Sequence, residues 1–208
     1  MTGMWKKYEV ELQFTTQFAS STPKNPLDIE AMLKAKMPSK PPEDPIPLPE
    51  LAEQVAEEVE ADEEVERGYA TFKRDENGLY YEARCVRAHI KDCANVLQKL
   101  LGKKALKSKV ANRVYIEPAK IYLSKSEPDG NETRIVHAMT MKGPRSSLKT
   151  IDYVDKPVLK FILKLMDDGE ITWDILEAIF EYGGEHGMGQ ERSQDWGKYE
   201  LRNLQEMS

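Results

Sequence analysis

The hydrophobic pattern of the chain begins with a clear alternation in residues 5–18. Apolar side chains occupy every second position from Tyr8 to Phe14, and charged or polar side chains stand between them. A period of two predicts a strand with one buried face. The same reasoning predicts further strands at 114–123, 134–141 and 198–201, and another at 157–166, whose length would also permit a helix.

Two segments have instead the period of an amphipathic helix. Apolar residues recur on one face from Val86 to Leu101, and Gly102 then ends the segment. The segment Trp173–Tyr182 has the same pattern, and Thr172 is a plausible N-cap for it. The sequence therefore predicts two helices that each bury one side.

A hairpin is predicted before the first helix, because Arg67–Lys73 and Leu79–Ala83 flank the turn signal Asn77-Gly78. With that hairpin set aside, the predicted order is strand, helix, two strands, helix, strand. This βαββαβ order indicates an α+β, ferredoxin-like (RRM-like) fold with an antiparallel sheet and both helices on one face. The other face would be free for a ligand, as in RNA-recognition sheets.

Residues 24–66 interrupt this order, and we expect them to be an insertion within a single domain spanning 1–208. Six of the twelve prolines lie between Pro38 and Pro49, which predicts an extended segment. Helical periods are visible at 28–37 and 50–66. Residues 43–66 contain 11 Asp and Glu and no Lys or Arg, so this part is either a solvated linker helix or a mimic of nucleic acid.

The net charge of −6 is unevenly distributed, because the residues outside 43–66 carry a net positive charge. Outside residues 43–66 the chain contains all 30 Lys and Arg but only 25 of the 36 Asp and Glu. Residues 81–149 alone contain 15 basic and 6 acidic residues. Such asymmetry favours a polyanionic partner, although a solvated lysine-rich surface would have the same composition.

Five of the twelve glycines lie between Gly183 and Gly197, just before the last strand. Backbone N–H groups of such a loop could bind phosphates, with Arg192, Ser193 and Lys198 as side-chain donors. The glycines could also serve only a tight crossing between helix and strand. The loop has neither a Walker Gly-Lys-Ser/Thr ending nor the strand-first setting of a dinucleotide fingerprint.

A family resemblance rests on the C-terminal pattern Tyr182-Gly183-Gly184-x-x-Gly187-x-Gly189-x-x-Arg192-Ser193-x-x-Trp196-Gly197-Lys198-Tyr199. It resembles the glycine-rich loop of the RAMP superfamily, the RNA-binding subunits of CRISPR effector complexes. Residues 79–91 are similar to that family's strand and helix with a basic residue that grips guide RNA. The chain departs from the family by lacking a glycine in residues 84–91 and by having Asp195 where a glycine is common.

The candidate nucleic-acid contacts follow from charge, from spacing and from this resemblance. Arg84, Arg87 and Lys91 form one row of a helix, and Lys103, Lys104, Lys107, Lys109 and Arg113 would extend it into the following loop. A basic loop is expected at 142–149, and tyrosines 80, 81, 115 and 122 could stack bases. The full set of candidates is Arg84, Arg87, Lys91, Lys142, Arg145, Gly184, Gly187, Gly189, Arg192, Ser193 and Lys198.

Catalysis has little support in the residues. His89, His137 and His186 are scattered without a metal-binding spacing, so we expect neither a metal nor a cofactor. The resemblance implies two weaker candidates, because some relatives cleave RNA with a histidine and others with an acidic residue in an early loop. These candidates are His89 and Asp28.

Three functions remain open from the sequence. The first is an RNA-binding subunit that holds single-stranded guide RNA by its backbone, with Cas-type subunits or copies of itself as partners. The second is a metal-independent endoribonuclease that processes repeat RNA. The third is a viral, anti-CRISPR-type decoy of a Cas subunit.

Cys85 and Cys93 are too far apart on one helix for a disulfide, and the apolar runs are too short to span a bilayer, so a cytoplasmic protein is expected.

Overall fold

The computed structural model describes residues 3–23, 67–140 and 143–207, without the side chains of residues 23, 67 and 136–147. The chain divides into two compact units. One comprises Met1–Thr22, Ala70–Glu132 and Ile151–Ser208, and the other comprises Pro23–Tyr69 and Thr133–Thr150. The predicted insertion at 24–66, with its Pro-rich and acidic segments, lies outside the described residues. The expectation of one domain over 1–208 therefore stays a prediction.

The first unit contains a four-stranded sheet in which all neighbours run antiparallel. Its strand order, β12-β1-β11-β7, places the first and third of its strands along the chain in the centre. The strands are β1 (Trp5–Phe14), β7 (Val114–Glu117), β11 (Val158–Met166) and β12 (Tyr199–Glu206).

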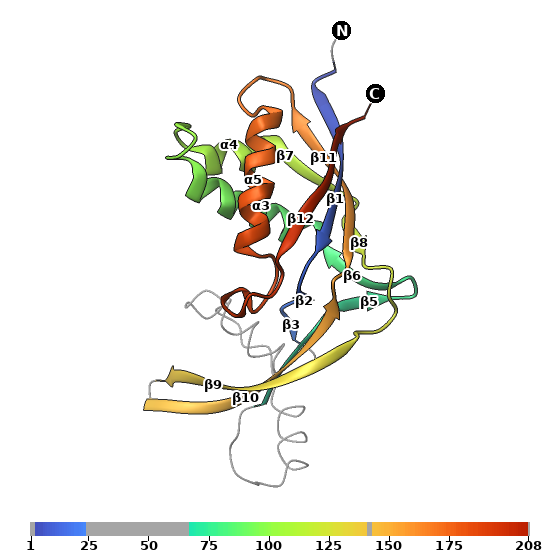
Figure 1. Ribbon diagram of the computed structural model, residues 1–208, viewed down its shortest axis with the longest axis vertical. Coiled ribbons are helices and arrows are strands. Elements are labelled where there is room, and N and C mark those ends of the chain that lie inside the picture. Colours follow the sequence, from blue (N-terminus) through green and yellow to red (C-terminus); the bar gives the residue numbers. More distant parts are fainter. Residues whose placement is uncertain (1–2, 24–66, 141–142, 208) are drawn as a thin grey trace, which may run out of the picture. The chain divides into compact units, whose positions relative to one another are not determined.

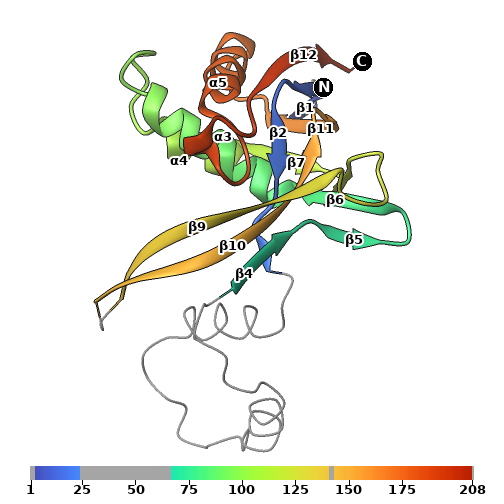
Figure 2. The ribbon, with the colours of Figure 1, turned by 60° about the horizontal axis from the view of Figure 1, so that its bottom comes forward.

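Three α-helices are described, and they gather on one face of this sheet (Figures 1 and 2). They are α3 (Ala83–Leu97), α4 (Leu106–Arg113) and α5 (Trp173–His186). The chain thus runs β1, α3, β7, β11, α5, β12, with α4 added after α3. An α+β fold with a mostly antiparallel sheet is confirmed, and the arrangement is consistent with the ferredoxin-like prediction.

The predicted alternation decides which face of β1 is buried. Tyr8, Val10, Leu12 and Phe14 are at most 3% exposed and belong to the main hydrophobic core. The apolar stripe of α3 reaches the same core, because its residues recur at helical spacing toward the sheet. The period of two in the strand and of 3.6 in the helix therefore converge on one interior.

A second set of strands includes the hairpin of β9 and β10. It has the order β2-β10-β4-β3, with β9 paired to β10. The prediction of a basic loop at 142–149 is wrong for residues 143–149, which lie in β10. The strands are β2 (Gln17–Ala19), β3 (Thr22–Pro23), β4 (Arg67–Thr71), β9 (Gly130–Thr140) and β10 (Gly143–Asp155).

A third sheet of three strands holds the predicted hairpin. Its strands are β5 (Lys73–Asp75), β6 (Gly78–Glu82) and β8 (Lys120–Tyr122), and the turn at Asn77-Gly78 is confirmed. The prediction of one strand over 114–123 is wrong, because β7 and β8 belong to different sheets. Pro118 lies between them and has no N–H for a ladder, so the chain leaves one sheet there and enters the other.

Two helical segments differ from the sequence expectation. Helix α4 was expected to be a loop, although Leu106 and Val110 are both fully buried and stand one helical turn apart. Helix α5 continues to His186, so the first two glycines of the predicted loop are helical. A short 3-10 helix, η1 (Arg192–Gln194), follows. No helix in the described part of the chain is long and apolar enough to cross a membrane.

Candidate nucleic-acid interface

The predicted row of cations on α3 divides in the structure. Arg84 is exposed at the start of the helix, and its guanidinium lies 2.7 Å from the Glu82 carboxylate. Lys91 is half-buried and has no ion pair among the described residues. Arg84 and Lys91 thus remain accessible, whereas Arg87 turns toward α4.

Arg87 connects α3 to its neighbours. Its guanidinium donates a hydrogen bond to the carbonyl oxygen of Ala111 in α4 and lies over the ring of Tyr115, 4.5 Å from its centre. Its Nε is buried without a partner. A guanidinium used in this way stabilises the packing of helix and strand, and it is a poor candidate for gripping a phosphate.

Helix α4 and the turn before it carry lysines of two kinds. Lys109 lies 2.6 Å from Glu170, and Arg113 lies 2.6 Å from Asp168, so these two cations are neutralised by the loop before α5. The remaining lysines have no ion pair within the described part of the chain. They are Lys99, Lys103, Lys104 and Lys107.

This α3–α4 surface is strongly one-sided in charge. Residues 83–116 contain nine Lys and Arg and a single acid, Asp92. Two of the nine are neutralised by acids from outside the segment, and Arg84 shares Glu82 with Lys73. The lysines around α4 therefore form a cationic surface that has no acidic partner within the described part of the chain. The sequence predicted the run of basic residues, but it did not predict helix α4, on which several of them lie.

The sheet face opposite the helices offers no such surface. Glu11 of β1 pairs with Lys160 of β11 at 2.8 Å, and Glu117 of β7 pairs with Lys164 at 3.2 Å. Because acids and bases alternate across neighbouring strands, their charges largely offset one another. The predicted ligand face of this sheet is thus close to neutral.

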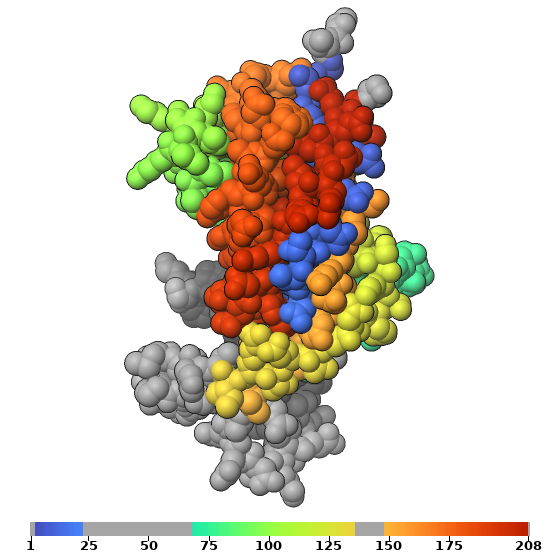
Figure 3. All heavy atoms as spheres, viewed as in Figure 1, coloured from blue at the N-terminus to red at the C-terminus, as the bar shows by residue number. Residues whose placement is uncertain are grey.

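The glycine-rich segment packs closely against two other parts of the first unit. Gly184 lies in α5, where a Cβ atom would collide with the carbonyl oxygen of Tyr199. Gly189 has a φ of +91°, and a Cβ there would collide with the carbonyl oxygen of Ala19. Gly187 is the C-cap of α5. In the space-filling view the C-terminal segment (red) lies against the N-terminal strands (blue) (Figure 3). The close approaches at Gly184 and Gly189 show that packing requires these two glycines.

The turn that contains Arg192 lies near α3, where His186 connects it to His89. Arg192 is exposed and hydrogen-bonds the Nε2 of His186 at 2.7 Å. The ring of His186 in turn stacks near that of His89, with centroids 6.1 Å apart. The hydrogen bond to His186, whose ring stacks on His89, therefore fixes the position of Arg192 at the surface.

His89 is enclosed by the core. It is 6% exposed, and its Nε2 lies 2.9 Å from the hydroxyl of Tyr199. Burial, with smaller contributions from the nearby His186 and Arg192, lowers the pKa of His89 to about 3. A neutral, buried imidazole at physiological pH has no access to a substrate, so the geometry does not favour His89 as a general acid or base.

Two other candidates in the turn differ in their surroundings. Ser193 is exposed in η1. Lys198 lies 2.9 Å from Asp195 and 3.7 Å from Glu185, and the hydrogen bond to Asp195 is the main cause of its raised pKa. Asp195, the residue that replaces a common glycine of the resembled family, thus partly cancels the charge of Lys198.

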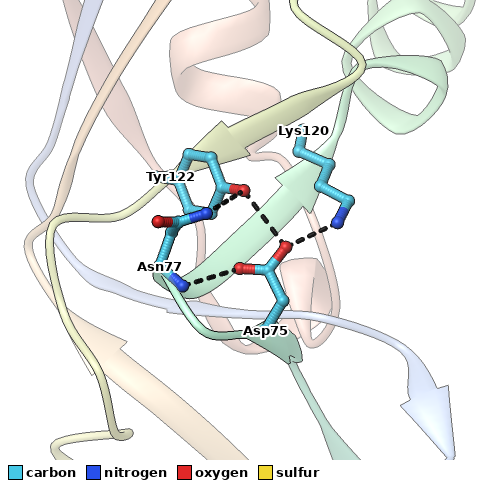
Figure 4. A network of polar contacts seen from close by, with 4 residues as sticks. All are labelled: Asp75, Asn77, Lys120 and Tyr122. Carbon is cyan, nitrogen blue, oxygen red and sulfur yellow. Dashed lines mark hydrogen bonds and ion pairs between the residues drawn. The ribbon is translucent and has the colours of Figure 1, made fainter.

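The exposed face of the β5-β6-β8 sheet holds a polar network that sequence reasoning missed (Figure 4). Asp75 accepts hydrogen bonds from Lys120 Nζ at 2.5 Å, Asn77 N at 3.0 Å and Tyr122 Oη at 3.1 Å. The bond from Lys120 contributes most to lowering the pKa of this carboxyl. The sequence did contain one indication of this network, because Lys120 and Tyr122 alternate with buried Ile121 and must therefore lie on the outer face of the strand.

Several predicted residues cannot be placed in this interface. Asp28 and Lys142 lie outside the described residues, and of Arg145 only the strand is described. No group of three or more potential metal ligands occurs in the described ranges. The described geometry offers a set of lysines without ion pairs on and around α4, and an exposed arginine, Arg192.

Comparisons with known proteins address the fold. No protein-family model matches the chain, and no curated protein matches it. Among solved structures, the chain is similar to a chain of the "Cryo-EM structure of the Type III-B Cmr-beta bound to cognate target RNA", with a TM-score of 0.50 and 11% identity. The match covers 99% of this chain and 61% of the other, so this chain spans less than two thirds of its neighbour's length. The two chains share a fold at this level.

Proposed function

We propose that this chain is an RNA-binding subunit of a CRISPR-type ribonucleoprotein, with a ferredoxin-like fold of the RAMP type. The similar chain comes from a Cmr complex solved with target RNA, which makes RNA and Cas-type subunits the natural partners to test. The strand order β12-β1-β11-β7 and the C-terminal glycine segment support the same assignment.

The observation that carries the proposal is the unpaired lysine surface of α3 and α4. A lysine surface without acidic neighbours attracts a phosphate backbone, and each contact releases condensed counterions. Arg84, Lys91 and Arg192 would add contacts on α3 and η1.

In this role the glycines act by allowing the chain to pack closely next to Arg192 and Ser193. Lys142, Arg145 and Lys198 stay in the proposed set on sequence grounds. Cytoplasmic localisation is part of the same proposal.

The test is the salt dependence of RNA affinity. Fluorescence anisotropy with a labelled single-stranded RNA would be measured for the wild type and for Lys103→Gln/Lys104→Gln/Lys107→Gln. Three lost phosphate contacts should reduce the slope of log affinity against log salt by about 2, because each contributes about 0.7 with single strands. The affinity itself should fall most at low salt.

The matched control removes three lysines that already have acidic partners. Lys6→Gln/Lys125→Gln/Lys160→Gln changes the net charge equally, but these lysines pair with Asp167, Asp129 and Glu11. We expect its slope to equal that of the wild type. An equal effect of both triple variants, or an RNA affinity too weak to measure in the wild type at low salt, would refute the proposal.

A further inference from the structure

The three-stranded sheet β5-β6-β8 has two very different faces. Leu79, Tyr81 and Ile121 point into the core and are at most 6% exposed. Tyr80 and Tyr122 alternate with them and are only half-buried on the other face. Because neighbouring positions of a strand point to opposite sides, the outer face presents two aromatic rings that the core does not use.

The two rings form an ordered pair. Tyr80 and Tyr122 stand directly opposite each other on neighbouring strands, with ring centroids 6.0 Å apart and an interplanar angle of 66°. Lys73 is opposite Tyr80 on the third strand, and the ammonium of Lys120 lies 4.9 Å from the centre of the Tyr80 ring. A row of one cation and two aromatic rings thus crosses the sheet.

Asp75 fixes this arrangement in advance of any ligand. Its carboxylate holds both the hydroxyl of Tyr122 and the ammonium of Lys120, and the backbone N–H of Asn77 in the hairpin turn anchors the carboxylate itself (Figure 4). Side chains that are already immobilised lose little conformational entropy when they bind. Asp75 is therefore a positioning residue for the ring and the cation.

The composition of this face selects its partner. Its outward residues are Lys73, Asp75, Tyr80, Glu82, Lys120 and Tyr122, without an aliphatic side chain. The cores of protein–protein interfaces are depleted of charged residues, so a partner protein would find little to bury here. Unpaired bases, by contrast, stack on aromatic side chains whatever their sequence. The two cations of this face are paired with Glu82 and Asp75, so the rings and not the charges would provide the binding.

We propose that the outer face of β5-β6-β8 is a stacking platform on which Tyr80 and Tyr122 receive unpaired bases of single-stranded RNA. This inference rests on the proposed function and makes it more specific, because stacking requires bases that are free of a duplex. The platform adds affinity for single strands that the lysine surface of α4, which contacts phosphates, does not provide.

The experiment compares Tyr80→Leu/Tyr122→Leu with Tyr80→Phe/Tyr122→Phe on the full chain. Labelled single-stranded RNA and an abasic strand of equal length serve as probes at several salt concentrations. The leucine variant should bind the single strand at least about tenfold more weakly, since stacking on one aromatic side chain gives about fivefold or more per base and two rings are lost. Its salt slope should equal that of the wild type, and the phenylalanine variant should retain most of the affinity.

Trp173→Leu is the matched control, because it also removes a partly exposed aromatic ring, but from α5, where the indole donates a hydrogen bond to the carbonyl oxygen of Leu204. It should leave RNA affinity unchanged. Wild-type affinity in the leucine variant, or an equal loss on the abasic strand, would overturn the platform. If the wild type fails to bind RNA at all, the proposed function falls as well. If it binds with the lysine-dependent slope but the leucine variant is normal, only the platform falls.

A second measurement does not depend on any variant folding. Ultraviolet cross-linking of the wild-type chain to the same single-stranded RNA, followed by mass spectrometry of the peptides, should place nucleotides on Tyr80 or Tyr122. Cross-links that fall on other aromatic residues, or a co-purified protein joined to this face in place of RNA, would contradict the proposal.

Discussion

The Nε2 of His89 lies 2.9 Å from the hydroxyl oxygen of Tyr199, and this contact joins the first described helix to the last strand. Both residues are buried, at 6% and 4% exposure. Gly183 of α5 leaves the space for them, since a Cβ at that position would collide with the Tyr199 hydroxyl. The histidine is thus a polar element of the core, and its hydrogen bond fixes the position of the strand that follows the glycine segment.

The burial of His89 predicts a loss of stability in mild acid. The pKa is about 3 in the folded chain and about 6.5 when unfolded, so between these values only the unfolded chain takes up the proton. The free energy of unfolding should fall as the pH drops below about 6.5, by up to about 1.4 kcal/mol per pH unit. The half-buried His186, whose pKa is also lowered, should add in the same direction.

Urea unfolding at a series of pH values would measure this slope. The variant His89→Gln keeps a hydrogen-bonding group near Tyr199 but removes the titrating imidazole. Its stability should depend less on pH between about 6.5 and about 4.5. An unchanged pH dependence in the variant would show that His89 is not the group responsible.

The close contact at Gly184 predicts that the glycines act through packing. In Gly184→Ala the new methyl group would meet the backbone of Tyr199, which cannot move without shifting β12. We expect the free energy of unfolding to fall by roughly 1–3 kcal/mol, as in other overpacked cores. Gly68→Ala is the control, because its Cβ would meet nothing within 4 Å. Equal stabilities of the two variants in urea would contradict this account.

The contacts of Arg87 predict a role in stability. Arg87→Lys keeps the charge but loses the planar group that spans Ala111 and Tyr115. The expected cost is about 1–2 kcal/mol, the range for a lost hydrogen bond and cation–π contact. Arg84→Lys, at an exposed ion pair, should change stability by less than about 0.5 kcal/mol. Thermal unfolding of both variants measures the difference, and similar melting temperatures would argue against the assignment.

The bond between Arg192 and His186 predicts a spectroscopic reporter. Arginine only donates, so the Nε2 of His186 must be the acceptor and its proton must be on Nδ1. Burial lowers the pKa of His186, and the charge of Arg192 lowers it further. Arg192→Gln should therefore raise this pKa in an NMR titration. Lys198→Gln should leave it unchanged, and a null result for Arg192→Gln would show that the two groups do not interact in solution.

Much of the first unit could be predicted from local pattern. The alternation in 5–18 and 157–166 fixed the buried faces of β1 and β11, because a strand that buries one side must place apolar residues at every second position. The Asn77-Gly78 hairpin followed from turn chemistry alone. Helix α4 was missed, since the lysines of 103–113 dominate its composition and only Leu106 and Val110 reach the core.

The candidate site was less predictable than the fold. A helical row places Arg84, Arg87 and Lys91 on one side, but the arrival of α4 and Tyr115 removes Arg87 from the surface. In the same way, the glycines of the C-terminal segment read as a phosphate loop, whereas Gly184 and Gly189 are required by backbones that come from elsewhere in the chain. Spacing along one element cannot reveal what a distant element will place against it.

The sequence by itself determined the periods of the strands and helices, the order in which they follow one another and the basic character of residues 81–149, because these properties depend on neighbours along the chain. Only the tertiary structure decided which cations have acids beside them, which histidine is buried and which tyrosines stay at the surface. Those properties depend on the desolvation and charge that each side chain meets after folding, and these come from residues far away in the sequence.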